Sequence, residues 1–312
     1  MGTPDFAVFT LAALKQAGHD IDLVVTQPDK PRGRGHKLSF SPVKEATLTL
    51  GLALMQPEKI REQIFVERLY EIAPDVIVVV AFGQILSEAI LAIPRYGCVN
   101  LHASLLPKYR GAAPIHMAVL NGEKITGNTT MLMDKGMDTG DILLTNKVDI
   151  GEDETTGAVH DKLAVSGAQL ILQTLAGLQD GNIVPRKQDN KVATYAAKLD
   201  RQMESIDWHK SSREIFNKIR GLNPWPTAYT NLQGSRLKIL KSRLVDNNDS
   251  KGNIPGQYIG ETQSGFLVAT GDGLLEVLEV QPESKKKMIA RNFIQGCKFA
   301  PKEEVFGRTI DV

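Results

Sequence analysis

The sequence predicts a doubly wound α/β domain followed by a small β-barrel domain. Short β-branched runs alternate with amphipathic helices through about the first 180 residues, as in parallel sheets that helices cover on both faces. After residue 222 the pattern changes to alternating apolar and polar residues around Gly and Asp turns, which is typical of antiparallel strands. The length of 312 residues agrees with two domains.

The first domain is expected to alternate strands with helices. A helix is predicted over 4–18, with a proline in its first turn and a glycine at its end. Strands over 21–26 and 75–81 enclose a helix over 62–73, in which apolar residues recur at helical spacing. In such sheets ligands bind at the carboxyl ends of the strands, where the strand order reverses.

The start of the sequence lacks an element that this pattern requires. Gly2, Thr3 and Pro4 form a strand-to-helix turn, yet only Met1 precedes them. A buried strand of about 5–6 residues is expected there, and without it backbone edges beside the cleft would be unpaired. We expect the natural protein to begin upstream of Met1, the alternative being a domain that begins with a helix.

A linker is expected between the two domains. Residues 1–184 form the catalytic domain, the polar and Lys-rich residues 185–203 form the linker, and residues 204–312 form the second domain. In the second domain a short helix over 211–222 precedes the strands, and Asp-Gly at 272–273 is a hairpin signal. A β-barrel of the oligonucleotide-binding type is the expected fold.

The composition excludes several classes of protein. No apolar run approaches the roughly 18 residues of a membrane span, and the N-terminus lacks the pattern of a signal peptide. The two cysteines, Cys98 and Cys297, form neither a disulfide framework nor a zinc pattern, which favours a reducing, cytoplasmic location. The six His residues lack ligand spacing, so we expect no metal.

The charge is unevenly distributed, although its sum is only +1. Residues 201–312 hold 17 Lys and Arg against 13 Asp and Glu, and of the totals of 37 and 36 this leaves 20 against 23 before residue 201. A basic second domain favours an anionic partner. A solvated charged face would explain the same count equally well.

Residues 98–116 read CVNLHASLLPKYRGAAPIH and place two polar side chains where an apolar strand gives way to a loop. Asn100 and His102 are two residues apart, so on a strand they project from the same face. An Asn amide can donate to a developing oxyanion, and a His can donate to it or move a proton near neutral pH. The pair suits attack on a carbonyl carbon without an enzyme nucleophile, although a buried His satisfied by backbone is commoner.

An acidic partner for His102 is expected in MDKGMDTGD, residues 133–141. This Gly-rich turn offers Asp134, Asp138 and Asp141, and a carboxylate there would orient the imidazole and raise its basicity. Asp side chains also stabilise turns through their own backbone, which accounts for at least one of the three. The residues by themselves leave the choice open.

Motifs along nearly the whole chain resemble those of the methionyl-tRNA formyltransferase family. They are NLHASLLPKYRGAAPI, GTPDF, TQPDKPRGRG, SPVK, VVVAFGQIL, MDTGD, NPWP and ATGDG. The Asn-x-His and Ser-Leu-Leu-Pro core is shared by transferases that use 10-formyltetrahydrofolate in general. TQPDKPRGRG and RGAAPI are more specific to the tRNA enzymes.

The resemblance implies a Rossmann-like formyltransferase domain, an activity and a site. The activity is transfer of the formyl group of 10-formyltetrahydrofolate to the α-amino group of methionyl-initiator tRNA, for translation initiation. The catalytic residues would be Asn100, His102 and Asp138. The folate cosubstrate would lie against Ser104, Leu105, Leu106 and Pro107, with its pterin end near Phe82, Gly83, Ile85 and Leu86.

A basic segment over 27–44 is the expected contact with RNA. It carries Lys30, Arg32, Arg34, Lys37 and Lys44 among prolines and glycines that argue against regular structure. A long basic loop beside a cleft can hold phosphates, and the family uses the matching loop to engage the tRNA acceptor stem. Arg34 is the residue that we expect to matter most.

Three other functions fit parts of the sequence. A formyltransferase for an amino sugar nucleotide or for glycinamide ribonucleotide would lack the basic loop and the basic second domain. A catalytically dead RNA-binding protein would have a broken catalytic group. A nucleotide-dependent oxidoreductase would carry Gly-x-Gly-x-x-Gly after the first turn, which this sequence lacks. We expect a cytoplasmic monomer without membrane contact.

Overall fold

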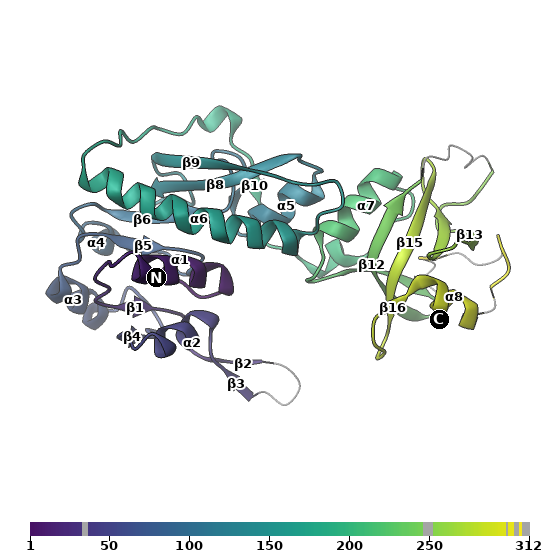
Figure 1. Cartoon of the computed structure of the whole chain (residues 1–312), viewed down its shortest axis with the longest axis horizontal. Helices are drawn as coiled ribbons and strands as arrows, with labels where there is room; N and C mark the ends of the chain where they lie inside the picture. The colour runs from purple at the N-terminus through teal and green to yellow at the C-terminus, as the bar shows by residue number, and fades with distance from the viewer. Residues whose placement is uncertain (33–36, 246–251, 298, 303–305, 308–312) are drawn as a thin grey trace. The chain divides into compact units, whose positions relative to one another are not determined.

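The computed structural model describes residues 1–32, 37–245, 252–297, 299–302 and 306–307 (Figure 1). These residues form two compact units. The first unit consists of Met1–Pro114, Ile125–Asp149 and His160–Ala196. The second consists of Ile115–Lys124, Ile150–Val159 and Ala197–Val312. The predicted domain boundaries at 184 and 204 stay predictions.

A four-stranded sheet lies at the centre of the first unit, in the order β5-β6-β8-β9. Its strands are β5 (Ile77–Val79), β6 (Cys98–His102), β8 (Ile125–Leu132) and β9 (Ile142–Asp149). β5 and β6 are parallel, whereas β8 and β9 run antiparallel to their neighbours. β5 consists of β-branched residues, as the sequence predicts, whereas β6 contains only one, Val99, and is buried along its whole length.

A second parallel pair, β1 (Val24–Val25) with β4 (Leu54–Met55), belongs to the same unit. The backbone of Met1 and Gly2 lies between β1 and β5. The Gly2 N–H donates to the Val25 carbonyl at 3.0 Å, and the Val80 N–H donates to the Met1 carbonyl at 2.9 Å. Gly2 also forms a parallel bridge with Val80, so this backbone links the two sets of strands.

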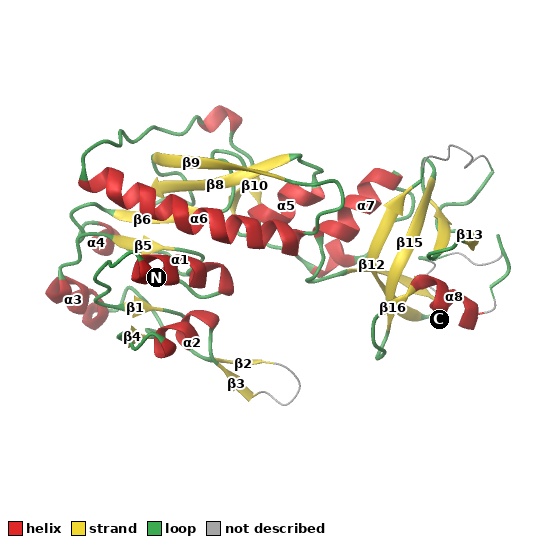
Figure 2. Cartoon of the chain, viewed as in Figure 1, coloured by secondary structure: helices red, strands yellow, loops and turns green. Residues whose placement is uncertain are grey.

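Helices cover these strands (Figure 2). They are α1 (Asp5–Gln16), α2 (Pro42–Thr49), α3 (Gln63–Ile72), α4 (Glu88–Leu91) and most of α6 (Thr156–Gln179). α6 packs closely on β6 and β8, because a Cβ at Gly167 would lie 2.9 Å from the Leu101 side chain. The Rossmann-like fold class is confirmed, and the helices predicted over 4–18 and 62–73 correspond to α1 and α3.

The second unit is built on an antiparallel sheet in the order β11-β12-β15-β14-β13, with β16 on β15. The strands are β11 (Ala228–Leu232), β12 (Ser235–Leu244), β13 (Tyr258–Glu261), β14 (Phe266–Ala269), β15 (Leu274–Pro282) and β16 (Met288–Ile289). Among the described residues β11 and β13 do not pair with each other, so closure into an oligonucleotide-binding barrel is not confirmed.

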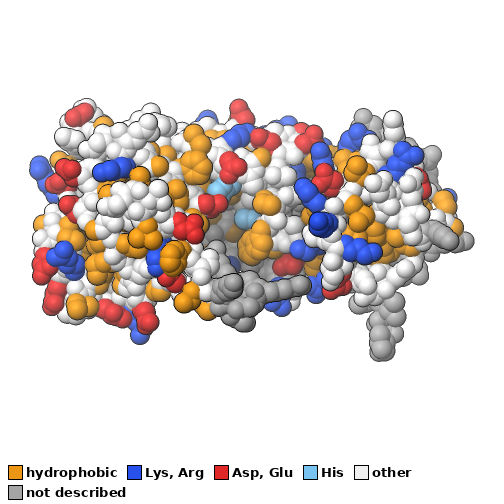
Figure 3. Space-filling view, turned by 60° about the horizontal axis from the view of Figure 1, so that its bottom comes forward, with side chains coloured by type: hydrophobic (Ala, Val, Ile, Leu, Met, Phe, Trp, Pro, Cys, Tyr) orange, Lys and Arg blue, Asp and Glu red, His pale blue; other side chains and the backbone are white. Residues whose placement is uncertain are grey.

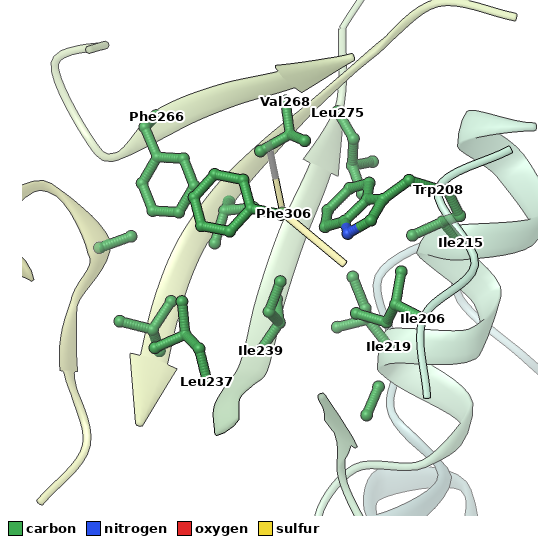
Figure 4. Close-up of a cluster of buried hydrophobic side chains, with 14 of the residues drawn as sticks. Ile206, Trp208, Ile215, Ile219, Leu237, Ile239, Phe266, Val268, Leu275 and Phe306 are labelled. Carbon is green, nitrogen blue, oxygen red and sulfur yellow. The ribbon is translucent and has the colours of Figure 1, made fainter. Parts of the chain in front are cut away.

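Helices and a buried aromatic cluster complete this unit, to which α5 (Pro114–Leu120) belongs from Ile115 onward. α7 (Ser212–Gly221) begins at a capping box formed by Ser211 and Glu214, and α8 (Ala290–Cys297) follows β16. The core gathers apolar side chains from α7 and from the sheet around Trp208 and Phe266 (Figure 4). Trp208 donates its indole N–H to Thr230 Oγ1 at 3.0 Å, which satisfies its buried polar atom.

The two cysteines differ in burial. Cys98 is buried in β6, and burial raises the pKa of its thiol to about 12, while Cys297 in α8 is only half-buried. Because the thiolate is the nucleophile, Cys98 stays neutral and inert at pH 8.

We expect a thiol reagent such as DTNB to label one cysteine in the native protein and two in denaturant. Rapid release of two equivalents from the native protein would contradict the buried position of Cys98.

Candidate active site

The polar residues of β6 stand on one face of that strand. Asn100 lies opposite Val79 of β5 and Met131 of β8, and His102 lies opposite Thr129 of β8. Both residues are nearly buried, with exposed fractions of 9% and 6%. The period of two along an extended strand therefore places them together at the carboxyl end of β6.

Both nitrogens of the His102 ring face protein oxygen atoms. Nε2 lies 2.9 Å from the Tyr109 carbonyl oxygen, and Nδ1 lies 3.6 Å from Asp138 Oδ2. A carbonyl only accepts, so we assign the proton of the neutral ring to Nε2. The unprotonated Nδ1 then faces the carboxylate. A proton that reaches Nδ1 would lie between the two groups, which suits proton transfer.

The structure distinguishes between the acids of the turn 133–141. Asp138 has a φ of 54°, in the left-handed region, and its Oδ2 accepts the Gly111 N–H at 2.8 Å. Asp134 instead accepts from the Gly136 N–H at 2.9 Å and from Thr139 Oγ1 at 2.7 Å, within its own turn. Asp138 is the acid beside His102, and Asp134 is the acid that stabilises the turn.

The Asn100 amide has no hydrogen-bond partner among the side chains and backbone groups that the structure describes. Its nitrogen and oxygen are not among the fully buried side-chain atoms that lack a partner, so the amide is accessible although the residue is nearly buried. Its NH₂ group can donate to a charged oxygen of a substrate that reaches the carboxyl end of β6. Such a donor is already oriented before the charge develops, as oxyanion stabilisation requires.

The segment 104–107, predicted to contact folate, is tightly held. Ser104 Oγ donates to the Lys108 carbonyl at 2.6 Å, and Thr129 Oγ1 joins the segment to β8. Thr129 Oγ1 donates to the Ser104 carbonyl at 2.7 Å and accepts from the Leu106 N–H at 3.1 Å. Ser104 and Leu106 are buried, so Leu105 and Pro107 are the members that offer side-chain surface.

The segment 82–86, predicted to lie near the pterin, divides in the same way. Phe82 and Leu86 belong to the buried core under α3 and α4. Ile85 is 81% exposed, and Gly83 has a φ of 85°, which a glycine adopts without strain. A ligand would contact Ile85 and the backbone at Gly83, while Phe82 and Leu86 anchor this segment in the core.

The basic segment differs from its prediction in one respect, because it contains regular structure. β2 (Lys30–Arg32) pairs antiparallel with β3 (Lys37–Ser39), so the expectation of an irregular loop is wrong for these residues. A two-stranded ribbon tolerates Pro31, because a strand at an edge needs no donor on its outer side.

The basic side chains of this segment are only partly described. Lys30 is exposed, whereas Arg34 and the side chains of Arg32 and Lys37 lie outside the described residues. Lys44 is bound to Asp29, and its hydrogen bond holds the pKa of that carboxyl below the usual value. Lys44 is therefore engaged within the protein.

The described ranges contain no group of three His, Cys, Asp or Glu side chains that could hold a metal ion. No helix within them combines the length and the hydropathy that a bilayer span requires.

Family models and curated relatives that resemble this chain are those of formyltransferases. The family model described as "Formyl transferase" matches residues 1–175, and "Formyl transferase, C-terminal domain" matches residues 198–298. A methionyl-tRNA formyltransferase of Lachnospira eligens is 50% identical over 299 residues, 95% of each chain. One of Clostridium novyi is 50% identical over 297 residues, again 95% of each chain.

Solved structures share the fold at lower identity. The sugar 3N-formyl transferase WlaRD superposes with a TM-score of 0.66 at 22% identity, covering 91% of this chain and 97% of its own. An N-formyltransferase from Helicobacter canadensis, solved with folinic acid and dTDP-3-aminofucose, gives 0.66 at 22% identity, covering 89% and 97%.

Proposed function

This chain belongs to the methionyl-tRNA formyltransferase family, and from that premise we propose that it formylates methionyl-initiator tRNA with 10-formyltetrahydrofolate. The product serves translation initiation. The observation that carries the catalytic assignment is the convergence of the free Asn100 amide with the His102–Asp138 pair at the end of β6. We also propose that the protein acts as a cytoplasmic monomer.

The proposed reaction forms one C–N bond and breaks another. The α-amino nitrogen of methionyl-tRNA attacks the formyl carbon, and the formyl oxygen becomes an oxyanion to which Asn100 donates a hydrogen bond. Collapse of the tetrahedral intermediate breaks the bond between the formyl carbon and N10 of the folate. The attacking nitrogen loses a proton and N10 gains one, so no oxidant or further reactant is needed.

His102 and Asp138 would move that proton. The amine acquires positive charge as it attacks, and a nearby carboxylate stabilises that charge. Nδ1 of His102 and Oδ2 of Asp138 lie 3.6 Å apart, so a proton taken from the amine can be held between them and delivered to the leaving nitrogen. The Tyr109 carbonyl and the Gly111 N–H keep the two groups oriented.

The second unit would hold the tRNA through its basic surface. Along β12 the exposed side chains include Arg236, Lys238 and Lys241, and they alternate with buried Leu237, Ile239 and Ser242. Figure 3 shows Lys and Arg side chains in blue at several places on one face of the molecule, with red Asp and Glu side chains among them. Phosphate contacts of this kind supply affinity without reading sequence.

Replacing Arg34 with alanine is expected to weaken tRNA use and to leave folate binding intact, since one phosphate contact is lost. The KM for methionyl-tRNA should rise several-fold, and the slope of log KM against log salt concentration should fall by about 0.9. Steady-state kinetics at three salt concentrations measure both. An unchanged KM for tRNA with an unchanged salt slope would remove Arg34 from the tRNA site.

The proposed function is tested by formyl transfer from 10-formyltetrahydrofolate to charged initiator tRNA. Elongator methionyl-tRNA and a dTDP-amino sugar are the comparison acceptors. We expect formyl-methionyl-tRNA from the initiator tRNA alone. Transfer to the amino sugar in preference would favour the sugar formyltransferases that share the fold, and no transfer to any acceptor would favour a dead RNA-binding protein.

A further inference from the structure

A buried arginine follows Tyr109 and precedes Gly111, the two residues whose backbone groups contact His102 and Asp138. Arg110 is 2% exposed, and its guanidinium donates from Nε and Nη2 to Gln188 Oε1, at 3.0 and 2.7 Å. Nη2 also donates to Asn190 Oδ1 at 2.9 Å. No carboxylate in the described part of the chain forms an ion pair with Arg110. A buried charge held by amides alone is expensive, which suggests that its position serves the site.

The other end of the Gln188 side chain holds the turn that carries Asp138. Gln188 Nε2 donates to the Asp138 carbonyl at 2.9 Å and to the Gly140 carbonyl at 2.8 Å. Its oxygen is used twice by Arg110, so all four bonding positions of the amide are occupied and its orientation is determined. This contact binds the backbone of Asp138 where the chain adopts a left-handed φ.

The chain after Gln188 also holds the backbone that orients both catalytic side chains. The Arg110 N–H donates to the Thr194 carbonyl at 2.9 Å, and Thr194 Oγ1 accepts from the Tyr109 N–H at 2.9 Å. β10 (Tyr195–Ala196) pairs in parallel with β7 (Arg110–Gly111). A Cβ at Gly111 would lie 2.7 Å from the Ala196 carbonyl, so only glycine allows this approach.

We infer that Arg110 and Gln188 are positioning residues, which set the Asp138 carboxylate against His102. Residues 188–196, assigned to a linker from sequence, return to the carboxyl end of β6 and hold both sides of the pair. Residues 188–196 hold the segment whose Tyr109 carbonyl contacts His102 and whose Gly111 N–H contacts the Asp138 carboxylate. Gln188 also holds the backbone of Asp138 itself. The inference rests on the proposed roles of His102 and Asp138.

The test is Gln188→Glu, with Asn190→Asp as its matched control. Both variants place a carboxylate against the Arg110 guanidinium and leave it an oxygen acceptor. Only Gln188→Glu removes the two N–H donors to the carbonyls of Asp138 and Gly140 and sets a charge against them. The difference between the variants therefore isolates the contact with the catalytic turn from the effect of the new charge.

We expect kcat for formyl transfer to fall at least about 10-fold in Gln188→Glu, because small displacements of a catalytic group cost up to about 10²-fold. The KM for folate and the melting temperature should stay near those of the wild type, since Arg110 gains an ion pair. In Asn190→Asp, kcat should stay within about 2-fold of the wild type. The pH profile of kcat should be displaced in the first variant alone.

A second readout does not depend on activity. His102 is followed by NMR of ¹⁵N-histidine-labelled protein, with its signal assigned from a His102→Gln sample. Its titration should change in Gln188→Glu more than in Asn190→Asp. Equal kcat and equal His102 titration in the two variants would overturn the inference. If the wild type forms no formyl-methionyl-tRNA, the proposed function fails, and the NMR comparison still decides whether Gln188 positions the pair.

Discussion

Replacing Asn100 with alanine is expected to lower kcat of formyl transfer by about 10²–10³-fold, the usual cost of removing one oxyanion donor. Asn100 is 9% exposed and its amide has no partner among the described residues, so a substrate oxygen would be its acceptor. The KM for folate should change little, because the donor acts on a charge that develops only in the transition state.

Asn100→Asp is the companion variant. It keeps the shape of the side chain and replaces its donors with acceptors, so it should be at least as inactive as Asn100→Ala. Thermal melts of both variants exclude unfolding as the cause. A kcat within about 10-fold of the wild type in Asn100→Ala would remove this residue from the mechanism.

Replacing Asp138 with asparagine should reduce kcat by about 10²-fold or more, on the scale of general acid–base contributions. The change keeps the size of the side chain and an oxygen for the Gly111 N–H, but it removes the charge that faces His102 Nδ1 at 3.6 Å. The amine then attacks without a carboxylate to receive its proton. Single-turnover kinetics with pre-bound tRNA measure the chemical step directly.

Asp134→Asn is the matched control for that variant, because it changes the same chemical group in the same turn. Its remaining oxygen can still accept from Gly136 and Thr139, so near-normal activity is expected. Equal losses in the two variants would show that the charge of the turn matters in general, and would remove the specific role of Asp138.

Local pattern predicted much of the first unit. The helices α1 and α3 follow from apolar periodicity, and the pair on β6 follows from the two-residue period of a strand. The antiparallel direction of β8 was not predicted, because strand direction depends on where the chain turns in space. The hairpin of β2 and β3 was also missed, because Pro31 and the glycines nearby argue against strands locally.

The folate site was predicted from two sequence motifs, in segments 82–86 and 104–107, which do not separate exposed from buried residues. The structure separates the members of each motif by exposure, with Ile85 outside and Phe82 and Leu86 in the core. A motif does not reveal this division, because burial is set by the elements packed around it. Whether these side chains contact folate stays a prediction.

The sequence by itself determined the fold class, the family and the chemical types at the site, because strand and helix periods and motif spacing are local properties. Tertiary structure alone decided which acid faces His102, where Arg110 is held, and that Gln188 reaches Asp138 across 50 positions of the chain. Such contacts are made by groups distant in sequence, and their geometry exists only once the backbone of both segments is in place. For that reason residues 188–196 looked like a linker in the sequence and lie against the catalytic group in the fold.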